Sequence, residues 1–128
     1  MNVPIERKGQ LYRTFLKTTQ NPNPKLDYIT ELRNQLSSTL WVTLTYVPDK
    51  LLLRPEAFIS YLEATLPTLA EPYENFAHIF LEDVNNEVVP RWLRIEVISE
   101  KDPTRRIVLI DRQPKWNNAP LLASLSSR

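Results

Sequence analysis

The sequence contains no cysteine, one glycine and one histidine. The absence of cysteine excludes thiolate nucleophiles, zinc ribbons and iron–sulfur clusters. Gly9 alone cannot supply the several glycines of a phosphate-binding loop or a dinucleotide fingerprint, where backbone amides approach the ligand closely. A single histidine argues against a multi-histidine metal site and against a Ser-His-Asp triad. Enzyme chemistry would therefore rely on carboxylate, lysine or tyrosine side chains, and we expect no cofactor.

Long hydrophobic runs are also missing. No apolar run approaches the roughly 18 residues that a membrane-spanning helix needs, and the N-terminal residues lack the apolar core of a secretory signal. We therefore expect a soluble, cytoplasmic protein without a membrane span. The 128 residues have the size of one domain, in which about two thirds of the unfolded surface becomes buried.

The chain has no excess of charge of one sign. Sixteen basic and fifteen acidic side chains leave a net charge of +1, so nucleic acid is not an expected partner. The N-terminal segment is locally basic, but its charges alternate with apolar residues as on a solvated face, which we favour over a polyanion site. The basic residues of this segment are Arg7, Lys8, Arg13 and Lys17.

His78 lies in a helical pattern in which Glu74, His78 and Glu82 recur every four residues and share one face. This spacing resembles half of a carboxylate–histidine metal site. No second segment offers further ligands, so a solvated or hydrogen-bonded helix face is the favoured interpretation and we predict no metal site.

The hydrophobic periodicity predicts two strand pairs around two helices. Residues 40–47 alternate as a half-buried strand, 51–53 form a short second strand, and 93–97 and 106–111 are further strands. Two helical stripes lie between them, the first from Pro55 to Pro67 and the second from near Pro72 to Pro90. Their apolar residues are Phe58, Ile59, Leu62 and Leu66 in the first, and Phe76, Ile79, Phe80 and Val84 in the second.

This order predicts an α+β fold, with one antiparallel sheet of about four strands (ββααββ) and both helices packed on one face. We divide the chain into an N-terminal arm (1–19), the folded domain (20–112) and a C-terminal tail (113–128). The tail is expected to be loosely held, with Trp116 and the Leu121-Leu122 pair as possible docking points.

Three strings together resemble the NADPH-dependent 7-cyano-7-deazaguanine nitrile reductases of queuosine biosynthesis and their tunnelling-fold relatives. The segment 21–28 (NPNPKLDY) is similar to the family's N-P-x-P-x-x-D-Y, residues 46–49 (YVPD) to its Y-[IV]-P-D, and residues 90–92 (PRW) to its P-R-[YW]. They occur in the same order and at similar spacing, and the resemblance extends over residues 20–111, nearly three quarters of the chain. The resemblance implies a tunnelling fold, in which strands of several subunits close a barrel.

The resemblance also implies ligand-binding positions. Tyr73 and Glu74 correspond to a family H-E pair whose glutamate grips the edge of a purine-like base. Arg54 replaces a substrate-contacting glutamate, and Glu56 could reach the same ligand. Arg105 and Arg106 stand where a glycine-containing turn of the family is associated with the nicotinamide cofactor.

The family's nucleophilic cysteine and proton-delivering acid have no counterpart between Tyr28 and Leu40, where the segment is shorter. Ser37 or Ser38 would be a weak substitute without a neighbouring base. A thioimide cannot form without a thiol, so an active nitrile reductase is the least expected function.

We therefore expect a non-catalytic binding or assembly module, present as a homo-oligomer or with a protein partner. The alternative is a protein that binds a purine or pterin through Glu74, as a binder or as an enzyme. Trp41 and Trp92 lie on the faces of their strands opposite the predicted core, so they either contact a partner or are buried beneath the arm or tail.

Overall fold

A computed structural model of the protein describes residues 12–102 and 105–127. Its elements are, in chain order, β1 (Thr18–Gln20), β2 (Thr30–Gln35), β3 (Leu40–Val47), β4 (Leu51–Leu53), α2 (Pro55–Thr65), the 3₁₀ helix η1 (Leu66–Thr68), α3 (Glu74–Glu87), β5 (Trp92–Ser99), β6 (Arg106–Arg112), α4 (Ala119–Ala123) and the 3₁₀ helix η2 (Ser124–Ser127).

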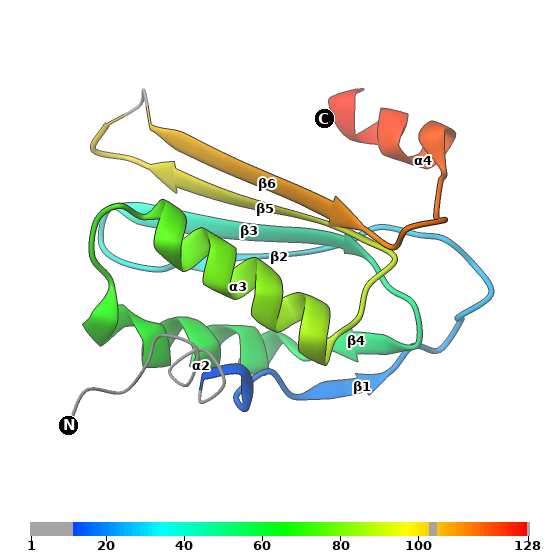
Figure 1. Cartoon of the computed structure of the whole chain (residues 1–128), viewed down its shortest axis with the longest axis horizontal. Helices are drawn as coiled ribbons and strands as arrows, with labels where there is room; N and C mark the ends of the chain where they lie inside the picture. The colour runs from blue at the N-terminus through cyan, green and yellow to red at the C-terminus, as the bar shows by residue number, and fades with distance from the viewer. Residues whose placement is uncertain (1–11, 103–104, 128) are drawn as a thin grey trace.

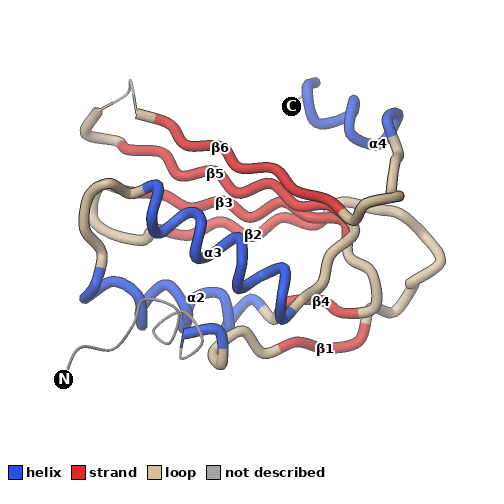
Figure 2. The backbone as a smooth tube through the Cα atoms, in the orientation of Figure 1, coloured by secondary structure: helices blue, strands red, loops and turns tan. Residues whose placement is uncertain are grey.

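The central layer is a four-stranded antiparallel sheet in the order β2-β3-β5-β6. Helices α2 and α3 cover one face of this sheet, and α4 lies beyond the other face (Figures 1 and 2). The predicted α+β class, the antiparallel pairing and the helices on one face are thus confirmed. The strand count is different, because six strands form in the described part of the chain rather than about four.

Three of these strands differ from the prediction, because β1 and β2 were not predicted and β4 belongs to a different sheet. Residues 51–53 do form a strand, but β4 pairs with β1 in a separate two-stranded sheet and does not join the large one. The fourth place in the large sheet belongs to β2, where Leu32 stands opposite Leu44 of β3. Leu32 is the only apolar residue of β2, so periodicity gives no signal there, and an outer strand needs little apolar surface.

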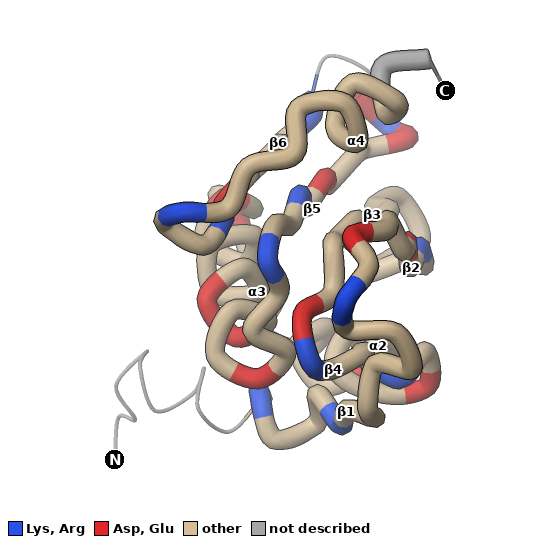
Figure 3. Tube along the Cα trace, turned by 90° about the vertical axis from the view of Figure 1, so that its right-hand side faces the viewer, with Lys and Arg blue, Asp and Glu red and all other residues tan. Residues whose placement is uncertain are grey.

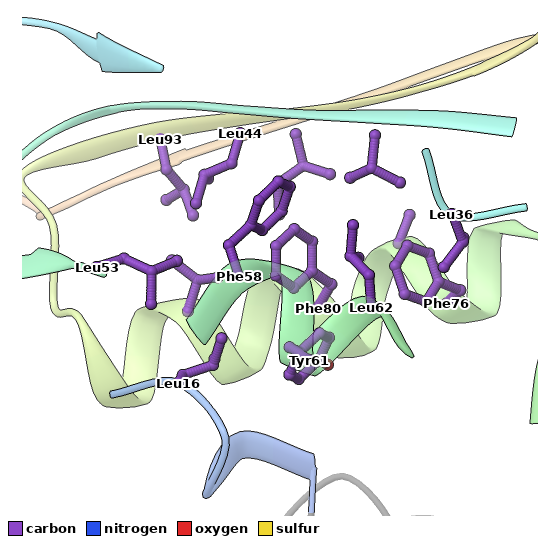
Figure 4. Close-up of a cluster of buried hydrophobic side chains, with 14 of the residues drawn as sticks. Leu16, Leu36, Leu44, Leu53, Phe58, Tyr61, Leu62, Phe76, Phe80 and Leu93 are labelled. Carbon is purple, nitrogen blue, oxygen red and sulfur yellow. The ribbon is translucent and has the colours of Figure 1, made fainter. Parts of the chain in front are cut away.

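The inner strands follow their predicted alternation. In β3, Leu40, Val42, Leu44 and Tyr46 are buried, and Leu93, Ile95 and Val97 of β5 are buried on the same face. The register aligns these two rows, with Leu44 opposite Ile95. Figure 4 shows Leu44 and Leu93 pointing from the sheet toward aromatic and aliphatic side chains of the helices.

Helix α2 begins at Pro55, whose missing amide needs no partner in the first turn. It buries Ala57, Phe58, Tyr61, Leu62 and Thr65, whereas the predicted core residues Ile59 and Leu66 are exposed. At about 100° per residue, the buried side chains span an arc of about 140° around the helix axis. Ile59 and Leu66 fall just outside this arc, on the solvent side.

Helix α3 begins at Glu74, slightly later than predicted, and ends before Pro90. Phe76, Phe80 and Val84 are buried as expected, and Ile79 is half-buried. The Phe80 ring lies 5.9 Å from that of Phe58 and 5.0 Å from that of Tyr61, between ring centroids. These aromatic contacts join the two helices into one layer. Within the described ranges, no helix is both long and apolar enough to cross a membrane.

Candidate functional site

The four residues that the resemblance assigns to ligand binding lie at two separate places. Tyr73 and Glu74 are at the start of α3, whereas Arg54 and Glu56 are at the start of α2. The two helices start at opposite ends of their layer (Figure 1). Because the 11 residues of α2 extend about 16 Å, one chain does not bring the two pairs to one ligand.

At the start of α3, the surroundings of Glu74 are those of a helix surface. Glu74 is exposed, and its backbone carbonyl accepts a hydrogen bond from Nδ1 of His78 at 2.8 Å. Tyr73 is half-buried against the core, and the guanidinium of Arg105 lies 5.2 Å from the centre of its ring. Among the described residues, no three His, Cys, Asp or Glu side chains gather as ligands for a metal.

The arginines assigned to a cofactor make ion pairs within the chain. Arg105 pairs with Glu71, and Nε of Arg106 donates to Glu96 at 2.6 Å. Arg106 belongs to β6 and its partner to the neighbouring strand β5. The two guanidinium groups thus each have an internal carboxylate partner.

Arg54 and Glu56 line a hollow of about 390 Å³ between β4 and β2. Tyr46 is the buried phenol in this lining, and its oxygen accepts a hydrogen bond from the backbone amide of Leu53 at 2.9 Å. Burial raises the pKa of Tyr46 above its usual value. Its position suits a structural link between β3 and β4 rather than acid–base chemistry.

The two tryptophans assigned to partner contacts differ in exposure. Trp92 is only 4% exposed and stands opposite Val47, which is also buried, on the face away from the helices. Of the two interpretations considered, burial therefore applies to Trp92. Trp41 is half-buried: its indole nitrogen donates to Glu100, and the guanidinium of Arg33 lies 4.7 Å from its ring centre.

A polar cluster around Arg91 joins all three strings that carry the resemblance. The Arg91 side chain, 18% exposed, pairs with Asp27 at 3.0 Å and with Asp49 at 3.1 Å. It also donates to the carbonyl oxygens of Pro24 and Leu26. These partners come from the segments 21–28 and 46–49, so one guanidinium links three distant parts of the chain.

Asn21 completes this Arg91 cluster. Its amide nitrogen donates to the carbonyl of Asp49 at 2.7 Å, and its oxygen accepts from the Tyr28 hydroxyl at 2.6 Å. The same oxygen accepts from the backbone amide of Asn23 at 3.0 Å. Asn21 is buried, so its hydrogen bonds are made away from water and hold the Pro-containing segment against the β3–β4 turn.

The C-terminal segment is anchored to the same cluster. The indole nitrogen of Trp116 donates to Asp27 at 3.0 Å, and the Asn118 amide donates to the same oxygen at 3.1 Å. Burial alone would raise the pKa of Asp27, but hydrogen bonds from Asn118, Trp116 and Arg91 hold it below its usual value of 3.8. Trp116 is thus a docking point, as predicted, and the tail is held by specific bonds rather than loosely.

Asp83 on α3 is a buried acid that the sequence analysis did not predict. Its Oδ2 atom accepts a hydrogen bond from the Tyr61 hydroxyl at 2.6 Å, in the interface between α2 and α3. Burial is the main cause that raises the pKa of Asp83 to about 6. Asp83 follows Phe80 by three residues and precedes Val84 by one. Because both are core residues, this helical spacing could have indicated that Asp83 is buried.

No protein-family model matches the chain, and no curated protein matches it in sequence. The resemblance to the nitrile reductases and the tunnelling fold therefore stay predictions.

Proposed function

We propose that this protein is a non-catalytic assembly module, related to the tunnelling-fold nitrile reductases, that associates with copies of itself through the edges of its large sheet. The observation that carries the proposal is that β2 and β6 are the outer strands, each paired on one side only within the described residues. An unpaired edge presents a row of amides and carbonyls that a further strand can bind.

The direction of the free amides of β6 follows from the ladder. Gln113 N donates to Arg91 O at 2.9 Å, and Ser99 N donates to Arg105 O at 3.4 Å. Residues of an antiparallel pair alternate between bonding each other and pointing away, so the odd-numbered residues of β6 bond to β5. The amides of Arg106, Val108 and Ile110 therefore point outward, whereas the Arg112 amide donates to the Asp111 carboxylate at 2.8 Å.

The same reasoning applies to β2, where Leu36 N donates to Leu40 O at 2.8 Å. The even-numbered residues bond to β3, and the amides of the odd-numbered residues point away from it. The Gln35 amide donates to Oδ1 of Asn34 at 2.8 Å, so it is not open to a further strand. Of the two edges, β6 thus has the longer row of outward amides. Two such edges on one chain permit head-to-tail association that can close into a ring.

The sheet face opposite the helices supports association. Ile110 of β6 is 59% exposed, and Val108 on the same strand and Ile98 of β5, which stands opposite Arg106, are also exposed. Arg94, directly opposite Ile110, has a buried Nε atom for which the described chain provides no hydrogen-bond partner. Because that nitrogen is buried, the exposed apolar side chains are the part of this face that another molecule can cover.

Light scattering after size-exclusion chromatography tests the proposal. We expect the wild-type protein to be a stable oligomer at micromolar concentration and Ile110→Lys to dissociate it, because a lysine charge would enter the interface. Ile59→Lys is the matched control, since Ile59 is 41% exposed and lies on α2 rather than on an outer strand. A wild-type monomer over the whole micromolar range refutes self-assembly, as does an oligomer that both variants leave equally intact.

A further inference from the structure

A hollow of about 780 Å³ lies where the N-terminal segment, β1 and the end of α3 meet. Arg13, Lys17 and Arg54 line it, with Glu87 as the acid in the lining. An adjoining hollow of about 500 Å³ shares Lys17 and Arg54. Figure 3 shows basic segments of the chain beside β1, at this side of the molecule.

Lys17 and Arg54 stand directly opposite each other. The β1–β4 register pairs Thr18 with Leu53, and the next step of the ladder places Lys17 against Arg54. The Arg54 amide donates to the Lys17 carbonyl at 3.1 Å, which confirms this step. Like charges directly opposite in a ladder destabilise it. Two cations at one position therefore favour a bound anion between them.

The acids nearby do not neutralise this pair. Glu87 forms an ion pair with Arg13 at 2.9 Å, which leaves Lys17 and Arg54 as the excess charge of the hollow. Arg54 Nε donates to the carbonyl of Thr18 at 3.3 Å. Glu56 lines the adjoining hollow with Arg54, but neither Arg54 nor Lys17 forms an ion pair in the described part of the chain.

We propose that this hollow binds the phosphate group of a small molecule, with Arg54 and Lys17 as the principal contacts. A guanidinium offers paired donors that match phosphate oxygens, and an ammonium adds a compact charge. Thr18 also lines the hollow, and its carbonyl accepts from Arg54. The hollow is large enough for the rest of a nucleotide-sized molecule. This site is independent of the sheet edges and goes beyond the assembly function.

Calorimetry with inorganic pyrophosphate and AMP, at constant ionic strength, tests the site. We expect binding by the wild type, and weakening by about tenfold or more in Arg54→Gln and in Lys17→Gln, because each removes a charge-assisted contact. Lys115→Gln is the matched control, since Lys115 is exposed in the tail segment and outside the hollow. It should bind as tightly as the wild type.

Thermal unfolding distinguishes a variant that has lost the binding site from a variant that does not fold. Pyrophosphate should raise the melting temperature of the wild type and of Lys115→Gln, and at the same concentration it should raise that of Lys17→Gln by clearly less. Without anion, Lys17→Gln should be at least as stable as the wild type, since the repulsion from Arg54 is gone. No binding by the wild type, equal binding by all variants, or binding only to vesicles containing phosphatidic acid would overturn the proposal.

Discussion

Asp83 should make the stability of the protein depend on pH in a direction opposite to that of most carboxyl groups. Its side chain is 4% exposed, and burial raises its pKa from 3.8 to about 6, which the hydrogen bond from Tyr61 only partly opposes. The charges of Glu82 and Glu87 act in the same direction as burial, and Arg13 acts against it. The folded state therefore holds this proton more tightly than the unfolded state does.

The sign and size of the effect follow from this difference in pKa. A raised folded-state pKa contributes stability that is complete below the unfolded value of 3.8 and is lost as the pH rises through about 6. At 1.36 kcal/mol for each pKa unit, the contribution of Asp83 to the free energy of unfolding falls by about 3 kcal/mol in all, and most of this fall occurs between pH 4 and pH 7. That is a large part of the 5–15 kcal/mol typical of a domain.

Asp83→Asn isolates this contribution, because asparagine still accepts the Tyr61 hydrogen bond but does not titrate. We expect the variant to be more stable than the wild type at pH 8 by up to about 3 kcal/mol and nearly equal to it at pH 4. Urea unfolding followed by tryptophan fluorescence measures both, and contributions from other groups cancel in the difference. Glu63→Gln, at an exposed position on α2, is the control for replacing a carboxylate by an amide. A difference for Asp83→Asn that does not change with pH would refute the reasoning.

Two further predictions concern the Arg91 cluster and catalysis. Arg91→Ala should lower the free energy of unfolding by about 3 kcal/mol, because it leaves two partly buried carboxylates without their cation, whereas Arg106→Ala, at a side chain 61% exposed, should cost at most about 1 kcal/mol. Equal losses in urea unfolding would contradict this ranking. The protein should not oxidise NADPH in the presence of 7-cyano-7-deazaguanine, and Ser38→Cys should not restore activity, because a thiol without a proton donor is not preorganised. Substrate-dependent loss of NADPH absorbance in the wild type would overturn that expectation.

The inner strands and the helices could be predicted because each has one buried face. Leu44 and Ile95 belong to rows in which every second residue is apolar, and this pattern fixes the face that meets the helices. Phe80 lies at the centre of a helical stripe in the same way. When one face of an element is buried, its apolar residues repeat with the period of that element. The inner strands and both helices were therefore predicted correctly.

The outer strand β2 and the pairing within the small sheet have no such periodic pattern in the sequence. β2 is mostly polar because an outer strand can take its place by backbone hydrogen bonds to β3, with Leu32 as its one apolar contact. The pairing of β4 with β1 joins residues more than 30 positions apart, and the sequence of Leu51–Leu53 does not indicate which strand it pairs with. The opposition of Lys17 and Arg54 depends on the same pairing and was invisible for the same reason.

The resemblance itself has a physical explanation in the Arg91 cluster. Asp27, Asp49 and Arg91 each stand in one of the three strings on which it rests, and Arg91 forms an ion pair with both aspartates. Removing one partner of a buried or partly buried ion pair destabilises the folded protein strongly. All three residues are therefore needed to hold the three segments together. They would be kept whether or not the protein has a catalytic site. The strings therefore favour a shared scaffold, and they are silent on the chemistry, which would depend on residues such as Glu74 that lie outside the cluster.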